Sequence, residues 1–172
     1  MIEYKTLTAK DIEKLKKIVP EDHPTELFGF KLSPEYEKIF LYPTNDVCLY
    51  EDQFNILKEI TPAGDRINIV QNGNYSVYRP GNTVYVLTGP FSFSEYESIL
   101  LDSVTMIYPD SMKWILLTDE ELYFGWGIFC ADKDTAKKIR DIYPAHTESM
   151  TKYTSAHISN PKVIKAMTEF LE

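Results

Sequence analysis

The chain has 172 residues, of which 44% are hydrophobic and 26% are charged, and this composition is ordinary for a globular domain. It carries 26 acidic and 18 basic residues, and the whole acidic excess lies between residues 21 and 130. Because that charge would repel a phosphate backbone, binding to DNA or RNA is not expected. No signal peptide opens the sequence and no apolar run approaches the ~20 residues that cross a bilayer, so we expect a cytoplasmic protein without a membrane segment.

Three helices are predicted in the first third of the chain. The first follows Thr8, which begins a Thr-x-x-Asp sequence similar to a capping box, and it ends before Pro20. Residues 33–40 open with Ser-Pro, which is typical of a helix start, and predict a short second helix. Residues 47–60 have apolar side chains every three or four positions, which favours a helix over a partial strand.

The sequence then changes from helical to strand periodicity. Residues 67–70, 75–78 and 83–87 are rich in β-branched and tyrosine side chains and predict three strands. An Asn-Gly pair at 72–73 and the sequence RPGN at 79–82 are turn signals between them. Two tight turns in succession predict an antiparallel meander.

A helix and two further strands are predicted next. Apolar side chains at helical spacing over residues 94–107, followed by Pro109, predict a helix of four turns. Residues 113–118 are apolar on both faces and predict a central strand, and residues 122–130 predict its neighbour. Residues 132–142 begin with an aspartate at the N-cap position and predict another helix.

The C-terminal part contains a polar stretch over residues 145–159, which predicts a mobile surface loop, and a last helix that starts at Asn160-Pro161. Together these elements predict the fold class. We expect a single α+β domain over residues 1–172, with an antiparallel sheet of about five strands and helices packed on it.

The segment LYFGWGIFC, residues 122–130, places two glycines in a predicted strand. Alternation puts its large apolar residues on one face, which must belong to the core. The other face carries Tyr123, Gly125, Gly127 and Phe129, so two missing side chains leave a notch between two aromatic rings. Such glycines make room either for another part of the chain or for a ligand or a partner's side chain.

Residues that commonly carry chemistry are sparse. The histidines His23, His146 and His157 lack the spacing of a metal site, and Cys48 and Cys130 stand alone in apolar surroundings, which predicts buried thiols. Neither a nucleophile motif nor a phosphate-binding glycine motif is present. The sequence therefore assigns no catalytic residue, no cofactor and no metal.

Residues 91–130 contain seven acidic residues and one basic residue, and an acidic turn formed by Asp119, Glu120 and Glu121 adjoins Tyr123. The simplest interpretation of this turn is solvation, but acidic residues beside a tyrosine also suit an interface with a basic protein. In composition the chain resembles small acidic bacterial immunity or inhibitor proteins, although no motif carries the resemblance. The leading hypothesis is a non-catalytic cytoplasmic protein that binds a basic protein partner.

Two other hypotheses stay open at this point. The first is an enzyme or a small-ligand-binding protein of unknown class, with its pocket over Gly125 and Gly127. The second is a structural or assembly subunit that forms a homo-oligomer through a tyrosine-rich face, because the chain contains 12 tyrosines.

Overall fold

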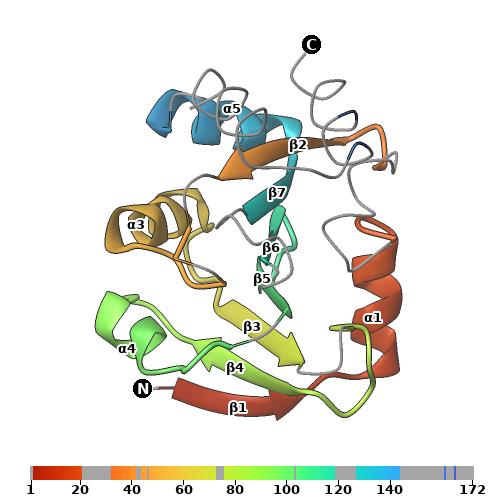
Figure 1. The fold of residues 1–172 in the computed structure, drawn as a ribbon, viewed down its shortest axis with the longest axis vertical. Helices are drawn as coiled ribbons and strands as arrows, with labels where there is room; N and C mark the ends of the chain where they lie inside the picture. The colour runs from red at the N-terminus through yellow and green to blue at the C-terminus, as the bar shows by residue number, and fades with distance from the viewer. Residues whose placement is uncertain are drawn as a thin grey trace.

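The computed structural model describes residues 2–20, 32–41, 44–45, 47–72, 76–102, 104–118 and 127–143, together with Pro161 and Lys165. These residues form one seven-stranded sheet, in which every pair of neighbours is antiparallel, and four helices (Figure 1). The predicted α+β class with an antiparallel sheet is confirmed, but the sheet has seven strands rather than about five.

The elements have the following bounds. The strands are β1 (Ile2–Thr6), β2 (Tyr36–Leu41), β3 (Ile67–Asn72), β4 (Thr83–Leu87), β5 (Val104–Pro109), β6 (Trp114–Thr118) and β7 (Gly127–Asp132). The helices are α1 (Ala9–Lys16), α3 (Glu51–Ile60), α4 (Phe93–Glu97) and α5 (Lys133–Ile142). None of these helices is long and apolar enough to cross a membrane.

The strand order is β1-β4-β3-β5-β6-β7-β2, so β1 and β2 form the two edges of the described sheet. Helix α1 covers one face, and α3, α4 and α5 cover the other (Figure 1). The interior strand β6 shows how side chains divide between the two faces. Ile115 and Leu117 point into the core beneath α1, and Trp114 and Leu116 point into the core beneath the other helices. The sheet is therefore buried on both faces.

Local signals at the helix starts and at one turn are confirmed. The Thr8 hydroxyl accepts a hydrogen bond from the Asp11 amide at 3.1 Å, and the Asp11 carboxylate accepts one from the Thr8 amide. At the start of α5, the Asp132 carboxylate accepts a hydrogen bond from the Thr135 amide at 2.8 Å. The RPGN turn places Gly81 at φ +95°, a conformation that favours glycine, and leads directly into β4.

The cap of α5 gives a testable pH dependence. Burial of Asp132 raises the pKa of its carboxyl, but hydrogen bonds from Thr135 and Lys113 outweigh burial and hold the pKa below its ordinary value of 3.8. A carboxyl group whose pKa is lower in the folded protein than in the unfolded chain stabilises the fold at pH values above the pKa of the unfolded chain. That stabilisation is lost as the pH falls through the pKa of the folded protein.

Asp132→Ala is therefore expected to lower the free energy of unfolding by about 1 kcal/mol at neutral pH, and by progressively less as the pH falls below 3.8. Asp132→Asn is the matched control, because asparagine keeps the cap but loses the ion pair with Lys113 at 3.2 Å. Urea denaturation across this pH range measures both variants. An Ala penalty that does not change with pH would contradict the assignment.

The helix predicted over residues 33–40 is wrong, because Tyr36–Leu41 is strand β2, paired with β7. Ser33 instead closes a turn by accepting a hydrogen bond from the Tyr36 amide at 2.9 Å. Phe40 lies in one core and Ile39 and Leu41 lie in the other, which is the two-residue alternation of a strand. Pairing with β7 outweighs the Ser-Pro start signal.

The four-turn helix predicted over residues 94–107 is also wrong. Helix α4 ends at Glu97, and Val104–Pro109 is strand β5. This strand pairs with β3 on one side and with β6 on the other. Every residue of β5 is buried. Val104 and Ile107 fit helical spacing by coincidence. A strand that is buried on both faces has apolar residues at nearly every position, so it lacks the apolar-polar alternation that would identify it as a strand.

The predicted three-stranded meander is wrong, because β3 and β4 pair directly with each other and residues 76–78 do not form the strand expected between them. Val77 is buried, and its carbonyl accepts a hydrogen bond from the Asn82 side chain. The Tyr78 hydroxyl donates to the carbonyl of Val19 beyond α1. Residues 77 and 78 are therefore held by hydrogen bonds that involve side chains rather than by the backbone hydrogen bonds of a strand.

The predicted helix over 47–60 is confirmed only from Glu51 onward. Of the predicted Asn-Gly turn, Asn72 is the last residue of β3 and Gly73 lies outside the described residues. The 145–159 loop and most of the predicted C-terminal helix also lie outside them; of that helix, Pro161 and Lys165 are helical.

Candidate functional site

Most residues that the sequence singled out fall outside the described part of the chain. These are Asp119, Glu120, Glu121, Tyr123 and Gly125, and the three histidines. Gly127 and Phe129 are described, and both are buried in β7.

The space over Gly127 is filled by the chain itself. A Cβ atom at this position would lie 3.0 Å from Leu116 Cδ1 and 3.5 Å from both the Leu117 carbonyl oxygen and Leu41 Cβ. Phe129 packs edge-to-face on Trp114, with ring centroids 6.1 Å apart. Close packing between neighbouring strands therefore accounts for Gly127, and the ligand notch stays a prediction that rests on Tyr123 and Gly125.

Gly127→Val is expected to lower the free energy of unfolding by about 1–3 kcal/mol, because the added Cβ and its two methyl groups would press on Leu116 and Leu41. Gly127→Ala, the control, adds one carbon that a small shift of the Leu116 side chain accommodates. Chemical denaturation of both variants measures the difference. A valine variant as stable as the original protein would show that the space is open.

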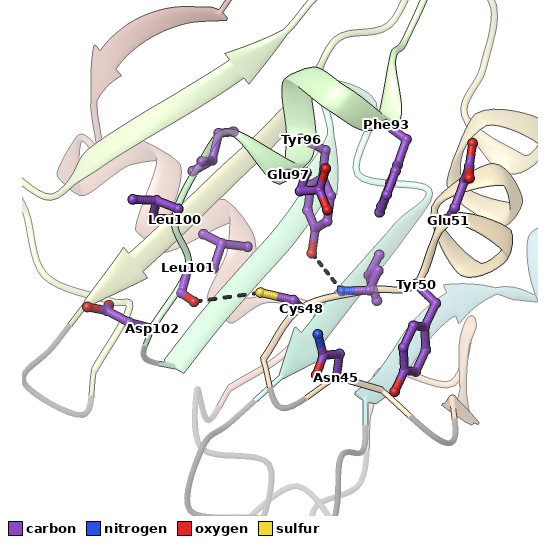
Figure 2. Close-up of a pocket in the computed structure, with 12 residues that line it drawn as sticks. Asn45, Cys48, Tyr50, Glu51, Phe93, Tyr96, Glu97, Leu100, Leu101 and Asp102 are labelled. Carbon is purple, nitrogen blue, oxygen red and sulfur yellow. Dashed lines mark hydrogen bonds between the residues drawn. The ribbon is translucent and has the colours of Figure 1, made fainter.

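The structure contains a pocket that the sequence did not predict (Figure 2). It lies between the 45–50 loop with the first residue of α3 on one side and α4 with the 97–102 segment on the other, and its volume is about 410 Å³. Both walls belong to the side of the sheet that α3 and α4 cover (Figure 1). A cavity of this size accommodates a small molecule or a large side chain.

Tyr96 anchors the floor of the pocket. Its ring is buried and stacks on Phe54 with centroids 5.0 Å apart, and its hydroxyl accepts a hydrogen bond from the Leu49 amide at 2.9 Å. Burial raises the pKa of Tyr96 and outweighs the opposing effect of the Leu49 hydrogen bond, so the phenol stays neutral. Phe93 lies beside it, with ring centroids 6.0 Å apart. The floor is therefore aromatic and uncharged.

Backbone hydrogen bonds shape one wall. Asn45 and Cys48 exchange two of them, each of 2.9 Å, which closes the loop before α3. The Cys48 thiol donates to the Leu101 carbonyl across the pocket, with 3.6 Å between sulfur and oxygen (Figure 2). On the opposite wall, Gln71 of β3 accepts a hydrogen bond from the Asp102 amide at 3.3 Å. The loop and the 97–102 segment are thus tied both to each other and to the sheet.

The rim of the pocket carries three exposed carboxylates, Glu51, Glu97 and Asp102, which we call the acidic rim. Among the residues that the structure describes, no lysine, arginine or histidine lines the pocket. Two large apolar side chains beside the rim are exposed as well, Tyr50 at 46% and Leu100 at 84%. An aromatic floor, exposed apolar side chains and an acidic rim together suit a group that is both apolar and positively charged.

The cysteines do not point to catalysis. Neither forms a disulfide, and burial raises the pKa of the Cys130 thiol to about 12, so this thiol stays protonated in the core. The expected thiols are confirmed, with Cys130 buried and Cys48 half-buried. Across the part of the chain that the structure describes, no group of three or more histidine, cysteine or acidic residues could hold a metal ion.

One contact links the pocket wall to Thr118, the residue that precedes the acidic residues 119–121 in the sequence. Thr118 is the last described residue before these acidic residues, and its hydroxyl donates to the Val47 carbonyl at 2.9 Å. Val47 belongs to the same loop as Cys48 and Leu49, so Thr118 is bonded to the pocket wall.

Sequence reasoning missed the acidic rim because it placed residues 97–102 inside a helix. The charge of residues 91–130, which includes Glu97 and Asp102, was the available signal.

Comparison with known proteins supplies no relative. No protein-family model, no curated protein and no solved structure matches this chain.

Proposed function

We propose that the protein is a non-catalytic, cytoplasmic, inhibitor-like binding protein, and that its pocket receives a basic side chain of a protein partner. The observation that carries this proposal is the acidic rim of Glu51, Glu97 and Asp102 around a pocket that no basic residue of the described ranges lines. The excess of acidic residues between positions 21 and 130 supports the same polarity at longer range.

The geometry favours an arginine or lysine side chain over a simple cation. A long basic side chain could lay its apolar stem against the floor formed by Tyr96 and Phe93 while its charged end reaches the rim carboxylates. Aromatic faces add attraction for such a charge. Tyr50 and Leu100 would extend the contact, since exposed apolar side chains beside a pocket are typical of binding surfaces.

Affinity capture from the source lysate tests the proposal, with bound proteins identified by mass spectrometry at low and at high salt. The rim variant carries Glu51→Gln, Glu97→Gln and Asp102→Asn. The control variant carries Glu13→Gln, Glu59→Gln and Asp141→Asn, which removes the same charge at exposed positions away from the pocket. Because salt screens charge attraction, the original protein and the control should retain a basic protein that weakens at high salt.

The rim variant should lose that protein. Equal capture by the rim variant, or no specific protein in any sample, would contradict the proposal.

The volume of the pocket favours one further candidate, a free organic cation of small size. Native mass spectrometry of the purified protein distinguishes this candidate. A retained small molecule that is absent from the rim variant would support a small-ligand function in place of a protein partner.

A further inference from the structure

Strand β1 lies at an edge of the described sheet. It pairs only with β4 among the described strands, and it forms one border of the sheet (Figure 1). The Leu7 amide donates to the Asn82 carbonyl, and the Leu7 carbonyl accepts from the Gly81 amide, so the backbone of Leu7 faces β4. Because this orientation alternates along an antiparallel strand, the backbone groups of Ile2, Tyr4 and Thr6 face outward.

The side chains of β1 differ from those of an edge strand that is protected against association with another strand. Tyr4 is 68% exposed, and its ring meets Tyr85 of β4 edge-to-face at 5.4 Å. Glu3 and Lys5 flank it, and both project from the opposite face of the strand. An edge strand guarded against association usually carries charge that any approaching strand would find unfavourable. Here the two flanking charges have opposite signs.

We propose that β1 pairs with β1 of a second copy of this chain, in an antiparallel register centred on Tyr4. In this register the outward-facing backbone of Tyr4 meets that of Tyr4 in the second copy, and Ile2 meets Thr6, which satisfies the hydrogen-bonding geometry of the ladder. The two sheets become one continuous sheet across a two-fold axis, which closes the edge. The proposal does not depend on the function of the pocket.

The charges select this register. With Tyr4 at the centre, Glu3 of each copy lies directly opposite Lys5 of the other, in the non-hydrogen-bonded pairs whose side chains approach most closely. Shifting the centre to Glu3 would place two glutamates opposite each other, and shifting it to Lys5 would oppose two lysines. Both alternatives are unfavourable. The sequence Ile-Glu-Tyr-Lys-Thr is thus complementary to itself only when Tyr4 faces Tyr4.

The tyrosines add a second complementary element. Tyr4 and Tyr85 lie on the same face of the sheet as cross-strand neighbours. Pairing two copies would set the two Tyr4 rings side by side and produce a row of four tyrosines across the axis. Aromatic pairs on one face are among the more stabilising cross-strand contacts.

Sedimentation of the purified protein over the micromolar to millimolar range tests the proposal, together with two charge reversals. Glu3→Lys sets lysine against lysine and Lys5→Glu sets glutamate against glutamate, so each variant should weaken the dimer at least about tenfold. Mixing the two variants in equal amounts restores opposite charges in both pairs, so a heterodimer should form. Glu13→Lys and Lys14→Glu on α1 are matched controls and should dimerise like the original protein.

Three results would overturn the proposal. The original protein could stay monomeric at every concentration, both reversals could leave dimerisation unchanged, or the mixture of the two reversed variants could stay monomeric. The double variant Glu3→Lys/Lys5→Glu keeps the register complementary, so its dimerisation shows that a failure of either single variant is not a folding defect.

Discussion

Trp114→Ala is expected to lower the free energy of unfolding by about 3–5 kcal/mol, because it removes the largest fully buried side chain of the core. Trp114 lies in the interior strand β6, between β5 and β7, and packs against Phe129 of β7. The cavity would open in the interior of the sheet, where neighbouring strands cannot easily collapse into it. Denaturation in urea, followed by circular dichroism, measures the loss.

Trp114→Phe separates volume from hydrogen bonding. The indole Nε1 of Trp114 is buried and has no hydrogen-bond partner among the described residues. Phenylalanine keeps one ring and removes this unsatisfied donor, so its penalty should be well below that of alanine. Equal penalties for the two variants would indicate that the indole N–H makes an interaction that the structure does not contain.

Tyr96 variants should affect both stability and the pocket. Tyr96→Phe leaves the buried Leu49 amide without its acceptor and should lower the free energy of unfolding by about 1–3 kcal/mol. Tyr96→Ala also removes the stack on Phe54 and should lower it by about 3–5 kcal/mol.

Hydrogen exchange at the Leu49 amide provides the specific readout. Exchange should be faster in Tyr96→Phe than in the original protein, while amides of β6 in the interior of the sheet keep their protection. Unchanged exchange at Leu49 would mean that the hydroxyl of Tyr96 does not hold the loop that forms the pocket wall.

Local features of the fold could be predicted where a few adjacent residues determine the backbone. Thr8 and Asp132 cap helices with hydrogen bonds inside their own first turns, and the RPGN turn depends on one glycine at positive φ. These interactions involve residues two or three positions apart, so the sequence alone contains them.

Strands β2 and β5 could not be predicted because β7, the partner of β2, and β3, one of the two partners of β5, lie far away in the chain. Tyr36 pairs with Asp132, and Ile107 of β5 pairs with Ile69 and Leu116. A Ser-Pro start signal and a coincidental helical spacing were stronger local patterns than the strand signals. Pairing on both sides of β5 and burial of its whole length then decide the conformation.

The pocket shows the same limit for function. Strands β3 and β4 lie between Glu51 and Glu97 in the chain, and the approach of these two residues depends on the sheet that brings α3 and α4 together. The sequence indicated an acidic middle region and a basic partner, but it could not indicate which carboxylates share one rim.

The central claim is that the acidic rim binds a cationic side chain, and nuclear magnetic resonance tests it most directly. The isotope-labelled protein is titrated with a short blocked peptide that contains one arginine, and with the same peptide carrying citrulline, which is nearly identical in shape but uncharged. The arginine peptide should shift the amide signals of Leu49, Glu51, Glu97, Leu101 and Asp102 in a saturable way, and the rim variant should not respond. Equal shifts with citrulline, or saturable shifts confined to other parts of the molecule, would contradict the account.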